Sequence, residues 1–294
     1  MIKYSTENAV KIAVYNQKGG CGKTISCFNI AGVLARDYRK KVLIVDIDSQ
    51  ANLSKSLLCE NIAQYEEEHG IGTWFNDHVT LDNVIEELPV NKDMVNQAVI
   101  KAKIIIRGGN PAKWRGIDVL PGSRNLATTD VRENGDMKEI ISRIRHTLQR
   151  PYDYDYVLFD LPPALSDLSA VTLIASDYVL IPASADSNAM DGIAELMETI
   201  ENIKINSDNK KLQILGVFFT NFDARYSYDN QLYELAGDTL GACLFHVPIR
   251  RGSAAKCGMQ LGCPLAWYQR TCSVAKDYEA LTKEMLKRID SGIQ

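Results

Sequence analysis

Nine residues decide the fold of this chain: Asn16-Gln17-Lys18-Gly19-Gly20-Cys21-Gly22-Lys23-Thr24. They follow the apolar run 11–15 and open the segment 24–39, whose apolar residues recur three or four apart, so they join a predicted strand to a predicted helix. Glycines let backbone N–H groups turn around a phosphate, and a helix N-terminus adds the positive end of its dipole. The stretch therefore predicts a phosphate loop, in which Lys23 contacts the β- and γ-phosphates of a nucleotide and Thr24 binds Mg²⁺.

The loop departs from the general pattern G-x-x-x-x-G-K-[ST], because Gln17 stands where that pattern has glycine. It also carries a second lysine, Lys18, near the predicted phosphates. A chance glycine-rich turn beside a lysine is the plain alternative. Two acidic motifs farther along the chain argue against that alternative.

Two further apolar runs end in carboxylates. Residues 42–46 end at Asp46, with Asp48 two residues later, and residues 156–160 end at Asp160. Side chains alternate along a strand, so Asp46 and Asp48 point the same way if the extended backbone continues. At the C-terminal edge of a parallel sheet, such carboxylates are placed to hold the water shell of Mg²⁺ or to orient an attacking water. Capping of a strand end is the alternative for any one of them.

Apolar runs rich in β-branched residues alternate with helical patterns along the whole chain. The runs are continuously apolar, as in strands that are buried on both faces. This pattern predicts an α/β fold with a doubly wound, mostly parallel, twisted sheet and helices on both faces. The predicted strands are 11–15, 42–46, 117–120, 156–160, 178–182, 214–220 and 243–247, and the predicted helices are 24–39, 136–149, 189–205, 228–240 and 274–289.

Composition indicates one globular domain. The chain has 294 residues, of which 46% are hydrophobic and 24% charged, and no repeat, low-complexity tract or linker divides it. We therefore expect a single domain over residues 1–294. Residues 59–116 mix acids, glycine and proline with short periodic pieces, and we interpret them as an elaboration of that domain.

The seven cysteines form no C-x-x-C pair and follow no secretory signal, which favours reduced thiols in a cytoplasmic protein. A zinc site made of His246, Cys257 and Cys263 is the alternative, but its spacing fits neither a knuckle nor a ribbon. No apolar run approaches the roughly 20 residues that cross a bilayer, which excludes a spanning protein.

The formal net charge of −4 argues against a uniformly basic surface for nucleic acid. The charge is unevenly distributed, however. From Arg250 to the end of the chain there are eight basic residues and four acidic ones. A surface that binds polyanions should therefore involve the C-terminal part.

Residues 18–24 resemble the deviant Walker A motif of the ParA/MinD family of ATPases. Residues 46–50 resemble the family's D-x-D-P-Q switch, with Ser49 in place of proline, and residues 156–163 resemble its Walker B strand and D-x-P-P loop. The resemblance covers nearly the whole chain. It implies a P-loop NTPase fold of the deviant Walker A type, ATP and Mg²⁺ as cofactors, and hydrolysis of ATP to ADP and phosphate.

The resemblance also implies a role for each charged residue of the site. Lys18 reaches the partner's ATP in a homodimer formed in the ATP state, and Lys23 binds phosphate. Asp48 positions the hydrolytic water. Asp46 supports the magnesium shell, and Asp160 contacts Mg²⁺ through water.

The nucleotide contacts that the resemblance implies lie mainly in the phosphate loop. A looser match of residues 216–223 and 247–264 to the adenine side of the family's site adds Asn221 and Pro248. The implied loop residues are Lys18, Gly19, Gly20, Cys21, Gly22, Lys23, Thr24 and Ile25.

Among the branches of the family, the ParA type, which partitions plasmids and chromosomes, fits the residues best. Arg225 lies where that branch has a DNA-contacting arginine, and Arg250 or Arg251 lies near a second one. The match implies binding of nonspecific double-stranded DNA through its phosphates, a ParB-like centromere-binding partner, and a cytoplasmic, nucleoid-associated protein without membrane contact. About ten residues precede the first predicted strand, so we expect no N-terminal operator-binding domain.

Other readings remain open. A MinD-like positioning ATPase would use a terminal amphipathic helix on a membrane, and Leu281, Met285, Leu286 and Ile289 do form an apolar face, although packing on the domain is the favoured account of that face. A P-loop metabolic ligase or synthetase is the less favoured alternative. The iron–sulfur branch is excluded, because no cysteine lies between Cys59 and Cys243.

Overall fold

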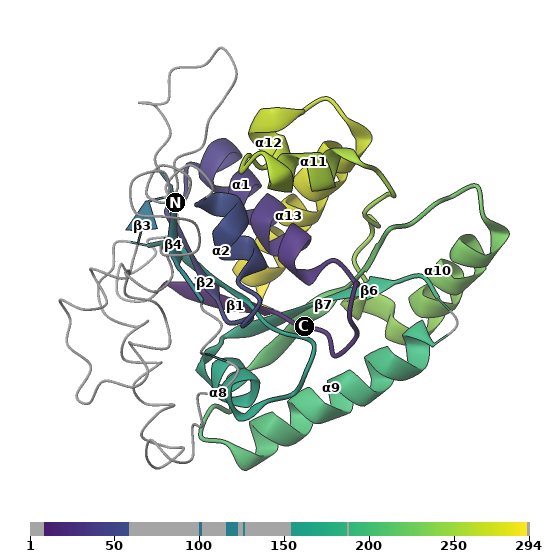
Figure 1. Ribbon diagram of the computed structural model, residues 1–294. Coiled ribbons are helices and arrows are strands. Elements are labelled where there is room, and N and C mark those ends of the chain that lie inside the picture. Colours follow the sequence, from purple (N-terminus) through teal and green to yellow (C-terminus); the bar gives the residue numbers. More distant parts are fainter. Residues whose placement is uncertain are drawn as a thin grey trace.

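The described residues fold around a sheet of seven strands, in the order β3-β4-β2-β5-β1-β6-β7 (Figure 1). The computed structural model describes residues 9–58, 100–101, 116–122, 126, 154–186 and 188–292. Six of these strands run parallel, and β3 pairs antiparallel with β4 at one edge. The strands are β1 (Val10–Val14), β2 (Val42–Asp46), β3 (Ile100–Lys101), β4 (Ile117–Leu120), β5 (Tyr156–Asp160), β6 (Tyr178–Ser184) and β7 (Gln213–Thr220).

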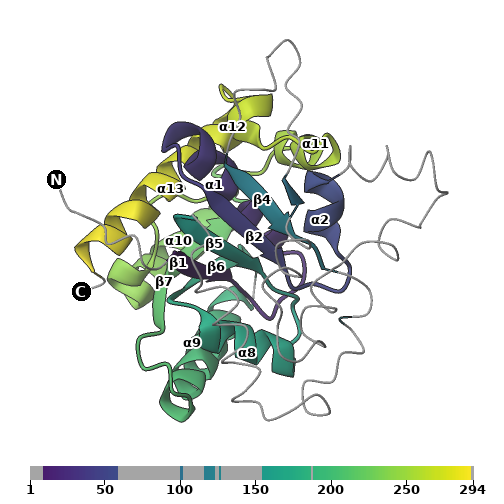
Figure 2. The ribbon, with the colours of Figure 1, turned by 90° about the vertical axis from the view of Figure 1, so that its left-hand side faces the viewer.

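Helices cover both faces of the sheet, as Figures 1 and 2 show together. One layer holds α8 (Asp167–Ala175), α9 (Ala189–Asn206) and α10 (Ser227–Leu240). The other holds α1 (Lys23–Asp37), α2 (Asn52–Leu57), α11 (Ala254–Gln260), α12 (Leu265–Tyr268) and α13 (Ser273–Ser291). The predicted fold class is confirmed.

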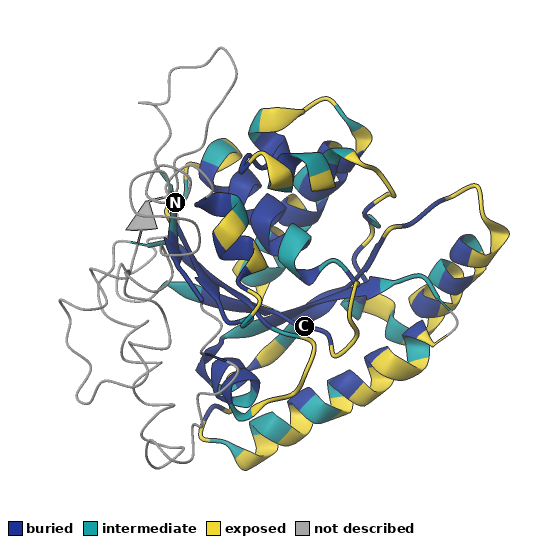
Figure 3. Ribbon diagram, viewed as in Figure 1, coloured by how far each residue is buried: buried dark blue, intermediate teal, exposed yellow. Residues whose placement is uncertain are grey.

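The central strands are buried on both sides (Figure 3). Successive side chains point to opposite faces of a strand, so β5 contributes Phe159 to one core layer and Leu158 to the other. β1 does the same with Ala13 and Val14. This double burial is the physical reason that the strands read as continuous apolar runs, since neither face of such a strand meets water.

The predicted strand 243–247 is wrong. Residues Gly241–Cys243 form a 3-10 turn, and the chain then forms an isolated bridge between Leu244 and Val217 of β7. The N–H groups of Phe245 and Ile249 donate to β7 carbonyls at 2.8 and 2.7 Å. Pro248, between them, has no N–H to donate, and the segment therefore lies beside the sheet without a continuous ladder.

The predicted helices 24–39, 189–205, 228–240 and 274–289 are confirmed to within a few residues. Among the described residues, four short α-helices were missed: α2, α8, α11 and α12. The missed helices have four to nine residues, too few turns for a periodic pattern to stand out. The predicted helix 136–149 and almost all of the elaboration 59–116 lie outside the described residues.

The last helix, α13, packs its apolar face inward. Leu281 and Met285 are completely buried, and Leu286 and Ile289 pack against the same core layer as α1. The face that could have bound a membrane is therefore covered by the protein itself. Among the described residues, no helix is long and apolar enough to cross a bilayer.

Candidate functional site

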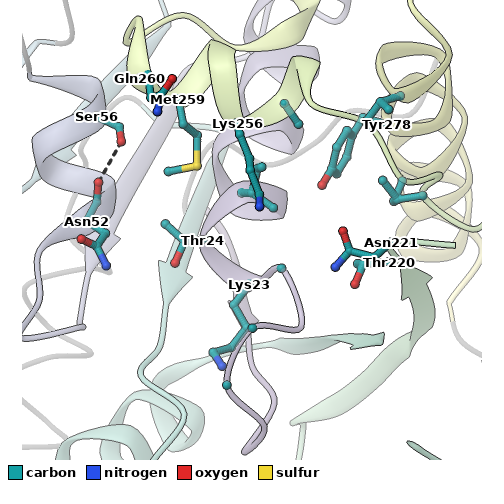
Figure 4. Close-up of a pocket in the computed structure, with 18 of the residues that line it drawn as sticks. Lys23, Thr24, Asn52, Ser56, Thr220, Asn221, Lys256, Met259, Gln260 and Tyr278 are labelled. Carbon is teal, nitrogen blue, oxygen red and sulfur yellow. Dashed lines mark hydrogen bonds between the residues drawn. The ribbon is translucent and has the colours of Figure 1, made fainter. Parts of the chain in front are cut away.

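An open cleft of about 800 Å³ lies at the carboxyl ends of the strands. The phosphate loop and the start of α1 form its floor, α2 and α11 form two walls, and the segment after β7 closes a third side (Figure 4). Ligands of open α/β sheets bind at this edge, outside the carboxyl ends of parallel strands. The predicted residues that line the cleft are Gly19, Gly20, Gly22, Lys23, Thr24, Ile25, Asp48, Asn221 and Arg250.

The phosphate loop is held from below by Asn16. Its side-chain amide donates to the carbonyl of Pro182 on β6 at 2.7 Å, and its side-chain oxygen accepts the N–H of Lys18 at 2.9 Å. The ammonium of Lys23 donates to the carbonyls of Asn16 and Lys18, both at 2.9 Å. The buried lysine thus lies across the inside of the loop, where it can exchange these carbonyls for phosphate oxygens.

The glycines of the loop leave space on its cleft side. Gly20 and Gly22 have φ values of 75° and 83°, a region that side chains disfavour. A Cβ added to Gly19 or Gly20 would meet no atom within 4 Å, so the loop backbone faces open space. Cys21 points the other way: it is buried, its thiol donates to the Lys18 carbonyl at 3.2 Å, and burial raises its pKa although Lys23 opposes the shift.

Lys18 lies at the mouth of the loop. Its ammonium pairs with Asp186, at the end of β6, at 2.5 Å, and the two side chains are 46% and 33% exposed. The pair is screened by water and holds the lysine only weakly. Within one chain, therefore, Lys18 is turned away from the interior of the phosphate loop, whereas Lys23 lies across it.

The aspartates at the ends of β2 and β5 are side by side in the sheet and almost fully buried. Asp46 accepts three hydrogen bonds, from the N–H of Ser54 at 2.8 Å, its hydroxyl at 2.6 Å and the N–H of Asp48 at 3.3 Å. Burial still raises the pKa of Asp46 to about 6, although the Ser54 donors lower it. The charge of Asp46 is thus stabilised only in part.

Asp160 has no such donors. Neither of its carboxylate oxygens has a well-formed hydrogen bond within the described residues. Burial, and then the charge of Asp46, raise its pKa well above the usual range, while the neighbouring Thr24 hydroxyl and Lys23 ammonium only partly oppose the shift. Buried polar groups are seldom left unpaired, so this carboxylate needs a cation or a proton. Oxygen donors of this kind suit Mg²⁺.

Asp48 is half-buried at the cleft edge, in the turn between β2 and α2. One carboxylate oxygen accepts the N–H of Gln50 at 2.9 Å, and the Asp48 carbonyl accepts the N–H of Ala51 at 2.8 Å. The other carboxylate oxygen accepts no hydrogen bond within the described part of the chain and can bind a water in the cleft.

Of the two residues expected on the adenine side, Asn221 lines the cleft, with an unusual φ of 54°. Pro248 does not line it, and its neighbour Ile249 does. The sequence pointed to the α11 wall only through the loose match of residues 247–264, and it did not indicate the α2 wall. The lining residues that were not singled out include Asn52, Lys55 and Ser56 of α2, Lys256, Met259 and Gln260 of α11, and Tyr278 of α13.

The three predicted arginines are brought together by an isolated bridge between Phe222 and Arg250. Arg225 pairs with Asp223 at 2.6 and 2.8 Å, a contact that lowers the pKa of Asp223 to about 2, yet the arginine side chain is 87% exposed. Arg250 is bound to the buried Asp277 of α13, with contacts of 2.6 to 3.1 Å.

Arg251 differs from the other two arginines. Its side chain is exposed and forms no hydrogen bond or ion pair with the described residues. Arg225 and Arg251 therefore offer charge to the solvent, whereas most of the hydrogen-bonding capacity of Arg250 holds its loop to α13.

Comparison with known proteins adds three findings. The sequence model of a family described as an AAA domain matches residues 9–214. The chain is 30% identical to the chromosome partitioning protein ParA of Myxococcus xanthus (94% of this chain, 88% of the relative) and 29% identical to that of Caulobacter vibrioides (94% of each). Its fold matches that of cobyrinic acid a,c-diamide synthase from Mycobacterium smegmatis, solved with an ATP analogue and magnesium, with a TM-score of 0.73, 22% identity, and 97% and 96% of the two chains covered.

Proposed function

The chain belongs to the ParA/MinD family of ATPases, and we propose on this basis that it is an ATP-driven switch that partitions plasmids or chromosomes. In this proposal ATP closes a homodimer, the dimer binds duplex DNA without regard to sequence, and a ParB-like centromere-binding protein stimulates hydrolysis and release. The observation that carries the proposal is the cleft, which gathers Lys23, Thr24 and Asp48 beside the unpaired carboxylate of Asp160.

The residues present fit ATP and Mg²⁺. The open side of Gly19 and Gly20 offers backbone N–H groups to phosphates, and the cleft above it is large enough for a nucleotide. Thr24 and Asp160 would hold the metal ion, which when bound neutralises charge on the terminal phosphates. Lys23 would bind the phosphates, and Asp48 would orient the attacking water.

Dimerisation is proposed from the placement of Lys18. Its side chain is half-exposed at the start of the phosphate loop, in a weak surface pair with Asp186 that a stronger anion can replace. A partner's triphosphate is such an anion, so a second copy would complete each site. Lys18→Ala should then abolish both ATP-driven dimerisation, measured by analytical ultracentrifugation, and ATP turnover.

DNA binding is proposed from the exposed arginines. Arg225 and Arg251 lie on neighbouring segments at the end of β7 and can reach two phosphates of one backbone. Contacts of this kind carry no sequence information and weaken as salt rises. Arg250 is held by Asp277, so it would keep this surface in place and would itself make fewer contacts with DNA phosphates.

The test is electrophoretic binding to random-sequence duplex DNA with ATP, with ADP and without nucleotide. We expect binding only with ATP, loss of about tenfold in affinity or more for the Arg225→Ala/Arg251→Ala variant, and a smaller salt dependence in that variant. Lys211→Ala, exposed at the opposite end of β7, is the matched control and should bind like the wild type. Binding that ignores the nucleotide would contradict the proposed switch.

A metabolic synthetase is the second candidate, because the synthase from Mycobacterium smegmatis shares the fold. At 22% identity that likeness supports the architecture alone. ATP turnover that rises when both DNA and the partner protein are added favours the switch. Turnover that is indifferent to both would favour the synthetase.

A further inference from the structure

The turn between β2 and α2 carries Asp48, and both ends of this turn are tied to one buried carboxylate. Asp46 accepts the N–H of Asp48 on one oxygen and both the N–H and the hydroxyl of Ser54 on the other. Ser54 is completely buried, so its hydroxyl does not compete for water. A single side chain thus fixes where the turn begins and where it ends.

A third segment, which follows β4, contacts Ser54. The Ser54 hydroxyl accepts the N–H of Gly122, just after β4, at 3.2 Å. A Cβ on Gly122 would lie 2.5 Å from the carbonyl oxygen of Asp46 and 3.2 Å from that of Asp48, so only glycine allows this approach. The backbone of the turn is therefore packed directly against the end of β4.

The turn needs such support, because its backbone is unfavourable. Ala51, which precedes α2, has a φ of 50°, a conformation that residues with a side chain disfavour. Strained residues of this kind persist only where the surroundings determine the conformation. Within the described residues, the hydrogen bonds from Ser54 to Asp46 join the helix after Ala51 to the strand before it.

We propose that Ser54, acting through Asp46, is a positioning residue that holds Asp48 in place for ATP hydrolysis. The inference rests on the proposed ATPase function and deepens it. Both oxygens of Asp46 are already used by donors of the chain, whereas those of Asp160 are not, so Asp46 shapes the turn and Asp160 would hold the cation. Lys23 and Thr24 belong to α1 and do not depend on this turn.

Ser54→Ala tests the proposal. The variant removes the hydroxyl from Asp46 and leaves the Gly122 N–H without its acceptor, so we expect kcat to fall about tenfold to a hundredfold, the range for a hydrogen bond to a charged group. Affinity for ATP should stay within about twofold, because the phosphate loop is intact. Ser176→Ala is the matched control, since it removes an equally buried hydroxyl that donates to the Thr172 carbonyl, at the far end of the sheet.

The decisive measurement is a double-mutant cycle with Asp48→Ala, using single-turnover hydrolysis in the presence of random-sequence DNA. If Ser54 acts through Asp48, Ser54→Ala has no further effect in the Asp48→Ala background, whereas any effect of Ser176→Ala is unchanged by that background. An unchanged kcat for Ser54→Ala, or equal losses in both backgrounds, would overturn the inference and leave the ATPase proposal standing. Absence of hydrolysis by the wild type under all conditions would overturn both.

Discussion

The ends of β2 and β5 look alike in sequence and differ in chemistry. Both are five-residue apolar strands that finish in a buried aspartate, and Asp46 and Asp160 are direct neighbours in the sheet. Asp46 accepts three hydrogen bonds, whereas neither oxygen of Asp160 accepts one within the described residues.

The difference follows from what comes after each strand. β2 is followed by a turn and α2, so the chain comes back and offers the N–H and hydroxyl of Ser54 to Asp46. β5 is followed by Leu161-Pro162-Pro163, and prolines have no N–H to donate. The Asp46 carboxylate therefore accepts hydrogen bonds from its own chain, and the Asp160 carboxylate is left for a cation.

The largest expected effect is on hydrolysis. Asp160→Asn should lower kcat by about a hundredfold or more and raise the magnesium concentration needed for half-maximal activity, because the charge beside Thr24 is lost. Asp46→Asn should leave that magnesium concentration unchanged, even where it lowers kcat. Titration of activity with magnesium separates the two, and a larger magnesium shift for Asp46→Asn would reverse the assignment.

The next effect is on the pH dependence of stability without magnesium. The pKa of Asp46 is raised to about 6 in the folded chain, so between about pH 4 and pH 6 the folded chain holds a proton that the unfolded chain has lost. Stability therefore falls as pH rises through this window, by roughly 2–3 kcal/mol for this group. Urea unfolding of wild type and Asp46→Asn at several pH values measures the difference between them, and a difference that does not change with pH would contradict the prediction.

The smallest effect is on stability at pH 7 without magnesium. Asp160→Asn removes a buried carboxyl whose ionised form is opposed by burial and by Asp46 and is only partly stabilised by Thr24 and Lys23, so the free energy of unfolding should rise by about 1 kcal/mol. Asp46→Asn loses at least one accepted hydrogen bond, so it should be less stable than Asp160→Asn by about 1–2 kcal/mol. Asp238→Asn, on the exposed side of α10, is the control and should change little. A higher urea midpoint for Asp46→Asn than for Asp160→Asn would contradict the prediction.

The sequence alone determined the main strands of the sheet and the phosphate loop. Residues 42–46, 117–120 and 156–160 were predicted as strands with the bounds that the structure has, because strands buried on both faces are mostly apolar. The phosphate loop was also readable, since its glycines, lysine and following helix are consecutive in the chain. Local patterns with a local cause can be read without a structure.

Only the tertiary structure decided how the site is completed. Three features depend on partners far away in the chain. They are the cleft walls from α2 and α11, the pairing of Arg250 with Asp277 while Arg251 stays exposed, and the failure of 243–247 to form a strand. The same holds for Asp46 and Asp160, whose sequence contexts are nearly identical. Whether a buried carboxylate is satisfied depends on which N–H and O–H groups the folded chain brings to it, and strand periodicity carries no information about those distant donors.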